Sequence, residues 1–284
     1  MSGDILLQVK GLKKYYPAGS SLFGRNQRYV KAVDGVDLAI RRGQTVGLVG
    51  ESGCGKSTLG KSVLRLIEPT QGSVEFEGQD VLRLPPKKMR ELRKRMQIVF
   101  QDPYSALNPR MTVFETVRST LDAFGIGDRQ TREKKVMDVI EYVGLSRQQM
   151  HRYPHEFSGG QRQRMIIARA LVLEPSFIVC DEPVSALDVS IRSQVLNLMQ
   201  DIQRERGLTY LFISHDLSVV KHVSDQVAVM YLGRIVEQAS RTQIFSNPQH
   251  PYTQALMSAI PIPDAGHRRQ HTTLEGAGPR PLDP

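Results

Sequence analysis

Short, almost wholly apolar runs recur along the chain, and each predicts a buried strand. They cover residues 45–49, 96–100, 177–181 and 209–214. Longer amphipathic stretches lie between them, with apolar positions at helical spacing, as in residues 112–153 and 189–203. Buried strands that alternate with helices indicate an α/β protein with a mostly parallel core sheet.

The two ends of the chain have different patterns. Residues 5–9 and 33–40 alternate apolar and polar positions, which predicts an antiparallel β subdomain before the first buried strand. Residues 261–284 are rich in Pro, Gly and Arg and show no period. We therefore expect one domain over residues 1–260, with a helical insert at about 103–173, followed by a C-terminal extension.

A motif for binding phosphate follows the first buried strand. Residues Gly50 to Thr58 fit the pattern G-x-x-x-x-G-K-[ST] without a mismatch. In such a loop backbone N–H groups point at one anion, Lys56 reaches the β- and γ-phosphates, and Ser57 supplies a hydroxyl ligand for Mg²⁺. A Gly-rich turn before a helix is the alternative, and the combination of strand, loop and helix counts against it. The predicted ATP-binding residues here are Gly50, Glu51, Ser52, Gly53, Cys54, Gly55, Lys56, Ser57 and Thr58.

Charge and composition narrow the class of partner only a little. The 284 residues have a formal net charge of +9, which favours anionic partners or an acidic membrane surface. Basic residues gather at 87–95 without interleaved aromatics, so a solvated helix face is favoured over a nucleic-acid site. Two cysteines do not make a disulfide framework. We expect no membrane span and no signal peptide.

Polar residues follow the buried strands, at the edge where an open α/β sheet binds its ligands. Asp181 is placed to hold Mg²⁺, and Glu182 can orient or deprotonate an attacking water. Gln101 can contact Mg²⁺ or that water, and His215 can hydrogen-bond the γ-phosphate. Each of these four residues also has a structural interpretation. A Gln at the end of a strand is common, acidic residues often cap helices, and a lone His is usually structural.

Two further features leave their alternatives open. The turn Ser158-Gly159-Gly160-Gln161 runs into a helix expected over residues 161–173, and it suits an anion or an ordinary N-cap equally well. An aromatic residue near the N-terminus can stack on adenine. Tyr16 is the first choice, with Tyr15 and Tyr29 as alternatives, and packing on the sheet is nearly as favoured.

In their order these motifs resemble the ATP-binding subunits of ABC transporters, over about residues 5–260. The likeness identifies Gly50–Thr58 as the Walker A loop, Gln101 as the Q-loop glutamine and Ser158–Gln161 as the signature, here preceded by Phe157 where Leu is commoner. It identifies Phe177–Asp181 as Walker B, Glu182 as the catalytic glutamate, Ser185–Asp188 as the D-loop and His215 as the switch histidine.

The resemblance implies a P-loop ATPase that works as a head-to-tail pair. Its catalytic residues would be Glu182, His215, Gln101 and Lys56, with Gln101 also contacting ATP. Its Mg²⁺ ligands would be Ser57, Gln101 and Asp181. Each ATP would also contact the signature and D-loop of the neighbouring subunit, here Ser158, Gly159, Gly160, Gln161 and Asp188.

Three stretches resemble the dipeptide and oligopeptide importer branch, and within it the F-type subunits. They are residues 101–109, 181–190 and 250–256, the last reading His-Pro-Tyr-Thr-Gln-Ala-Leu. Members of the branch often have a cysteine-bearing C-terminal tail, sometimes with an iron–sulfur cluster. No cysteine follows Cys180 here, so a cluster in this chain is not supported.

The branch implies that the chain energises the import of peptides and lies at the cytoplasmic face of a bacterial inner membrane. The expected partners are a second, non-identical ATPase subunit, two transmembrane permeases and an extracytoplasmic substrate-binding protein, with no nucleic acid. Nickel or an antimicrobial peptide is the alternative cargo. A soluble ABC-type ATPase acting on ribosomes or DNA is a second class, and a non-catalytic regulatory subunit is a third, against which Glu182 and His215 both count.

Overall fold

The computed structural model describes residues 4–18, 28–102 and 106–258. The chain divides into two compact units. The first takes the residues up to Leu84 and those from Leu211 onward, and the second takes Pro85–Tyr210. Candidate site residues therefore belong to two separate bodies, each with its own strands and helices.

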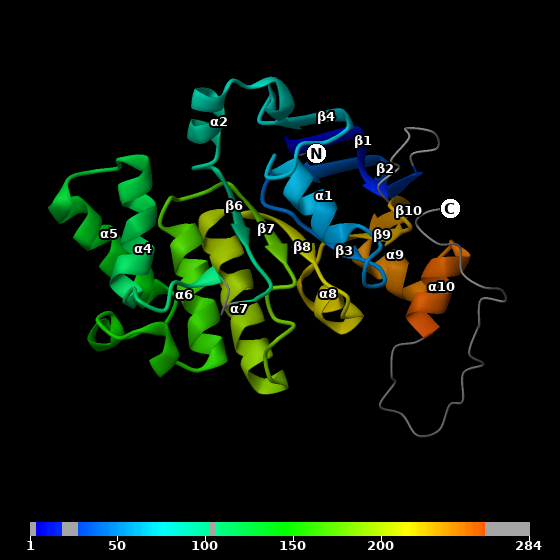
Figure 1. Cartoon of the computed structure of the whole chain (residues 1–284). Coiled ribbons are helices and arrows are strands. Elements are labelled where there is room, and N and C mark those ends of the chain that lie inside the picture. The colour runs from blue at the N-terminus through cyan, green and yellow to red at the C-terminus, as the bar shows by residue number, and fades with distance from the viewer. Residues whose placement is uncertain (1–3, 19–27, 103–105, 259–284) are drawn as a thin grey trace, which may run out of the picture. The chain divides into compact units, whose positions relative to one another are not determined.

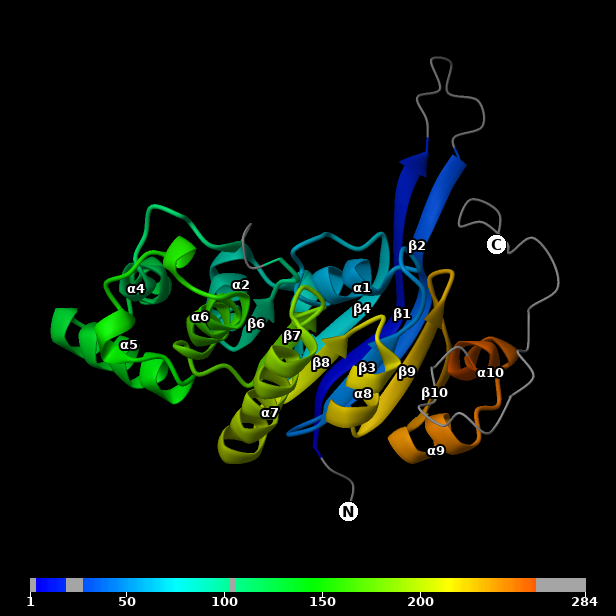
Figure 2. The ribbon, with the colours of Figure 1, turned by 90° about the horizontal axis from the view of Figure 1, so that it is seen from below.

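An antiparallel sheet in the first unit is formed by strands in the order β2-β1-β4-β5. These are β1 (Ile5–Ala18), β2 (Arg28–Arg41), β4 (Gln71–Phe76) and β5 (Gln79–Asp80). The expectation that the first strand ends near Val9 was wrong, because pairing with β2 continues through several register shifts as far as Ala18. Figure 2 shows β1 and β2 as a long hairpin. Bulges of this kind break the regular alternation by which a strand is recognised.

The first unit also holds β3 (Thr45–Val49), β9 (Gln226–Tyr231) and β10 (Arg234–Ser240). Strand β3 is parallel to β9, while β9 and β10 form an antiparallel hairpin. Strand β8 (Thr209–Ile213), whose last three residues belong to this unit, lies beside β3 in the strand order. All five residues of β3 are buried, as a parallel core strand requires.

Among the described residues of the first unit, four helices pack around these strands. They are α1 (Lys56–Val63), α8 (Leu217–Val223), α9 (Arg241–Ser246) and α10 (Pro251–Ser258), with a 3-10 turn at Val81–Arg83. Helices α9 and α10 lie beside β9 and β10 (Figure 1), and one core cluster joins Val49 and Val229 to Ile244, Tyr252 and Met257. The C-terminal helices are therefore part of the core behind the first buried strand.

In the described part of the second unit, strands β6 (Met96–Val99) and β7 (Phe177–Asp181) are parallel neighbours. Its helices are α2 (Pro86–Leu92), α4 (Val113–Phe124), α5 (Arg129–Tyr142), α6 (Gly159–Leu171) and α7 (Val189–Arg206), with 3-10 turns at Arg147–Gln149 and Pro154–Glu156. Helix α6 begins two residues earlier than expected. In the described part of the chain, no helix combines the length and apolarity needed to cross a membrane.

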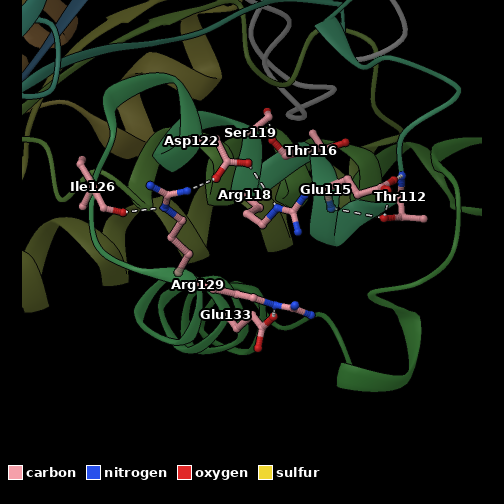
Figure 3. A network of polar contacts seen from close by, with 10 residues as sticks. Thr112, Glu115, Thr116, Arg118, Ser119, Asp122, Ile126, Arg129 and Glu133 are labelled. Atoms are coloured by element: carbon pink, nitrogen blue, oxygen red, sulfur yellow. Dashed lines mark hydrogen bonds and ion pairs between the residues drawn. The ribbon is translucent and has the colours of Figure 1, made fainter.

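A polar network holds the helices α4 and α5 together (Figure 3). Arg132 donates to the Asp122 carboxylate at 2.7 Å and to the Ile126 carbonyl at 2.9 Å, closing the loop between the helices. At the start of α4, Thr112 and Glu115 form a capping box, as their spacing predicts. With an antiparallel N-terminal sheet, mostly parallel core strands and these helices, the structure confirms the expected fold class.

Candidate functional site

Gly50 and Gly55 shape the loop between β3 and α1. Gly50 has φ 153° and Gly55 has φ 111°, both in the region that side chains rarely adopt. A Cβ on Gly55 would lie 1.9 Å from the Ala32 carbonyl oxygen, and one on Gly50 would lie 2.1 Å from that of Met230. The loop therefore passes so close to β2 and β9 that only glycine fits at both positions.

Lys56 lies at the first position of α1 and is held by the loop that precedes it. Its ammonium donates to the carbonyl oxygens of Gly50 and Glu51, each at 2.7 Å. Only 4% of the residue is exposed, so the backbone contacts offset the cost of burying a charge. The structure thus places the predicted phosphate-binding lysine on the loop itself.

Cys54 is buried within the same loop, 3.8 Å from the Lys56 ammonium. Burial raises the pKa of its thiol, and the nearby Lys56 charge opposes part of that rise. A buried, protonated thiol behaves as a small packed side chain. Cys54 therefore fills space in the loop.

Residues distant in sequence support the loop from outside. The N–H of Gly233, in the turn between β9 and β10, donates to the Cys54 carbonyl at 2.9 Å. The Tyr252 hydroxyl in α10 accepts the N–H of Glu51 at 3.0 Å. In the sequence, Tyr252 is recognisable only as part of a motif typical of one branch. Its position in that motif was the available signal, and its contact with the loop could not be read from spacing.

His215 follows the C-terminal end of β8, the strand that lies next to β3. The N–H of Ser214 donates to the Leu48 carbonyl at 3.1 Å, so the chain before His215 lies beside the strand that enters the phosphate loop. Asp216 then caps α8 by accepting from the N–H groups of Ser218 and Val219. His215 is exposed, on the same edge of the first unit as Lys56.

Gln101 and Glu182 meet in the second unit because of strand register. Strands β6 and β7 are parallel, and Val99 lies opposite Cys180, so residues two further along each strand are neighbours. The Gln101 amide donates to the Glu182 carboxylate at 3.0 Å. Asp181, the last residue of β7, is 5% exposed. The predicted polar strand ends of this unit are therefore brought together.

Glu182 has an unusual backbone conformation for a residue with a side chain. Its φ is 50°, and its carbonyl accepts from the hydroxyl of Ser185 at 3.1 Å. A left-handed φ costs about 1–3 kcal/mol and is found disproportionately at functional sites. The turn continues to Asp188, which is exposed and stands at the N-cap position of α7.

The turn Ser158–Gln161 forms a capping box at the start of α6. The Ser158 hydroxyl accepts the N–H of Gln161 at 3.4 Å, and the Gln161 side chain accepts the N–H of Ser158 at 3.1 Å. A Cβ on Gly160 would lie 2.2 Å from a methyl group of Ile191 in α7, so this glycine is required for close packing. The cap explains why α6 begins at Gly159, and the Ser158 hydroxyl still has a proton to donate.

The aromatic residues considered for adenine lie in the β1–β2 hairpin. Tyr16 has the Lys14 ammonium 4.9 Å from its ring centroid. Tyr15 instead donates its hydroxyl to Asp34, which also accepts from Arg234 at 2.6 and 3.1 Å. Tyr29 is 45% exposed. The choice of Tyr16 for adenine stays a prediction.

The predicted site residues are divided between the two units. The phosphate loop, Lys56, Ser57 and His215 belong to the first, while Gln101, Asp181, Glu182, Asp188 and the Ser158 turn belong to the second. Oxygen ligands suit Mg²⁺, so the Ser57 hydroxyl and the buried Asp181 carboxylate are chemically appropriate donors. The assignment of roles to these residues stays a prediction.

The chain matches two family models, described as ABC transporter over residues 33–185 and as oligopeptide/dipeptide transporter, C-terminal region, over residues 236–284. It is 49% identical to the oligopeptide transport ATP-binding protein AppF of Bacillus subtilis, over 99% of this chain and 86% of that protein. It is 51% identical to the dipeptide transport ATP-binding protein DppF of Escherichia coli, over 98% of this chain and 83% of that protein.

Solved structures of ATP-binding cassettes have the same fold. The cassette MJ0796, in a dimeric post-hydrolysis state bound to ADP and Pi, aligns with a TM-score of 0.72 and 27% identity, over 83% of this chain and 98% of that one. The protein cbiO1 of Clostridium perfringens, part of the cbiONQ transporter complex, aligns with a TM-score of 0.73 and 28% identity, over 86% and 92%. The chain belongs to the ABC transporter family, as one of its ATP-binding subunits with the C-terminal region of oligopeptide and dipeptide transporters.

Proposed function

We propose that this chain hydrolyses ATP to energise the import of dipeptides or oligopeptides across a bacterial inner membrane, at its cytoplasmic face. The observation that supports this best is the match of residues 236–284 to the C-terminal region of oligopeptide and dipeptide transporters. The match of residues 33–185 to the ABC transporter family supports the ATPase part of the proposal. Identity of about one half to AppF and DppF, over nearly the whole chain, supports the same cargo class.

The first unit would bind the nucleotide. The loop from Gly50 to Thr58 would cradle the phosphates with its N–H groups and the N-terminal end of α1. Lys56 would exchange its contacts with the Gly50 and Glu51 carbonyls for the β- and γ-phosphates. His215 would hydrogen-bond the γ-phosphate, and Tyr16 would stack on adenine.

The second unit would act on the water. Glu182 would orient or deprotonate the water for in-line attack, and its bond to Gln101 gives it a partner until that water arrives. Ser57, Asp181 and Gln101 would hold Mg²⁺, which supplies positive charge against the phosphates. Ser158 to Gln161, with Asp188, would close on the ATP of a neighbouring subunit.

The proposed assembly pairs this chain with a second, non-identical ATPase subunit and with two permeases that meet an extracytoplasmic binding protein. Within residues 1–260, the helical insert at about 103–173 would transmit closure of the ATPase pair to a permease. The extension over residues 261–284 lies outside the described residues.

The test is to purify the chain from a bacterial membrane extract in mild detergent and identify what accompanies it. Recovery of two permeases and a different ATPase subunit is the expected result. Recovery with ribosomes or nucleic acid, or of the chain alone, would contradict the proposal and favour a soluble ATPase. Peptide-stimulated ATP hydrolysis by the complex with its binding protein would then separate peptide from nickel as cargo.

A further inference from the structure

The His250-Pro251-Tyr252 motif begins helix α10, and its residues connect strand β10 with the phosphate loop. Glu237 in β10 accepts the N–H groups of Gln249 at 2.9 Å and His250 at 3.0 Å. Burial raises the pKa of the Glu237 carboxyl, but the hydrogen bonds donated to it outweigh that effect and the pKa is lowered. Glu237 is therefore a stable anchor for the start of α10.

Each residue of the motif has a separate physical role. The Nδ1 atom of His250 accepts the N–H of Tyr252 at 3.1 Å, satisfying a donor that the helix leaves unpaired. Pro251 is the first helical residue, where its fixed φ favours the helix and its missing N–H costs nothing. Tyr252 follows, with its ring buried in the core of the first unit.

The ring of Tyr252 is held so that its hydroxyl reaches the phosphate loop. Only 3% of the residue is exposed, and the ring lies against Tyr231 of β9 with 4.2 Å between centroids. Its oxygen accepts the N–H of Glu51 at 3.0 Å. Burial raises the pKa of Tyr252 to about 12, so the phenol stays neutral near pH 7.

The peptide group that Tyr252 contacts is the one that holds Lys56. The N–H of Glu51 and the carbonyl of Gly50 belong to a single planar peptide unit. Tyr252 binds its N–H, while the Lys56 ammonium binds its carbonyl at 2.7 Å. Rotation of this peptide would break both bonds together, and hydrogen bonds in such a chain strengthen one another.

We propose that Tyr252 is a positioning residue for the ATP site, which fixes the Gly50–Glu51 peptide and through it Lys56, and that it couples helix α10 to nucleotide binding. This inference rests on the proposed function, because it assumes that the loop binds ATP. The coupling is reciprocal: if α10 stabilises the form of the loop that binds ATP, then ATP binding stabilises α10 in return.

The test compares Tyr252→Phe with Tyr231→Phe in the full chain. Both changes remove one hydroxyl and keep the aromatic pair, and in residues 4–18, 28–102 and 106–258 the Tyr231 hydroxyl makes no hydrogen bond. Tyr252→Phe is expected to weaken ATP binding and raise the KM for ATP by about two- to tenfold, the worth of one hydrogen bond, with kcat nearly unchanged. Tyr231→Phe is expected to bind ATP like the wild type.

Hydrogen exchange gives a second readout that a general loss of stability would not reproduce. In Tyr252→Phe the peptide covering residues 50–54 should exchange faster than in the wild type, while peptides away from the loop and α10 should exchange at the wild-type rate. ATP should slow exchange in residues 251–258 of the wild type, and less so in Tyr252→Phe.

Two results would overturn the inference and leave the proposed function intact: equal ATP affinity of the wild type and Tyr252→Phe, or equal weakening in both Tyr→Phe variants. A wild-type chain that binds no ATP would overturn both the inference and the proposed function.

Discussion

The two units support their site residues in different ways. In the first, the phosphate loop is held by elements far away in sequence, since Gly233 and Tyr252 bind its backbone and Ala32 lies against Gly55. In the second, the register of two strands aligns Gln101 with Glu182, and a capping box shapes the Ser158 turn. The difference fits the proposed division of roles, in which the first unit binds ATP and the second acts on water and on a neighbouring subunit.

The largest effect is expected from removing the proposed base, Glu182, which should abolish most ATP hydrolysis and leave ATP binding intact. Glu182→Gln keeps the shape of the side chain and a partner for Gln101, but it cannot accept a proton. Hydrolysis should fall by about 10²–10⁴-fold, while ATP affinity stays near that of the wild type. Steady-state ATPase assays and nucleotide titration measure the two quantities. The control, Glu174→Gln at an exposed position just after α6, should retain the wild-type rate. An active Glu182→Gln would contradict a catalytic role in the second unit.

Two glycine substitutions in the phosphate loop test whether its close packing against β2 stabilises the first unit. Gly55→Ala should lower the free energy of unfolding by about 1–3 kcal/mol more than Gly53→Ala, because its Cβ would overlap the Ala32 carbonyl. Gly53 also has positive φ, but a Cβ there meets nothing within 4 Å. Chemical denaturation and ATP titration provide the comparison. Equal effects of the two changes would show that backbone conformation, not contact with β2, limits this loop.

A pH-dependent effect on stability is expected at the ion pair between Asp34 and Arg234. Arg234 follows Gly233, whose N–H supports the phosphate loop. Hydrogen bonds from Tyr15 and Arg234, which outweigh the effect of burial, lower the pKa of Asp34. The contribution of Asp34 to stability is therefore complete above its ordinary pKa of 3.8. It is lost as the pH falls through the lowered pKa of the folded protein. Asp34→Asn should cost roughly 1–3 kcal/mol at pH 7.

The difference between the wild type and Asp34→Asn should disappear under strongly acidic conditions, as followed by urea denaturation from pH 7 to pH 2. A difference that does not change with pH would mean that Asp34 acts by its shape and not by its charge.

The sequence predicts the loop and the polar strand ends well, because both depend on short-range patterns. Gly50 to Thr58 follow a fixed spacing, and parallel strands bring residues such as Gln101 and Glu182 to a common edge. The full length of β1 was missed because its bulges hide the alternation. The contact between Tyr252 and the phosphate loop was missed because it joins residues 201 positions apart, and such a contact leaves no local pattern in the sequence.

The most direct test of the account concerns the turn Ser158–Gln161, which is proposed to serve the ATP of a neighbouring subunit. The measurement is ATP affinity of the isolated chain together with ATP hydrolysis by the assembled complex, for Ser158→Ala and for Lys56→Ala. We predict that Ser158→Ala leaves the affinity of the isolated chain unchanged and lowers hydrolysis by the complex by about tenfold or more. Loss of affinity in the isolated chain as large as that of Lys56→Ala would contradict this account.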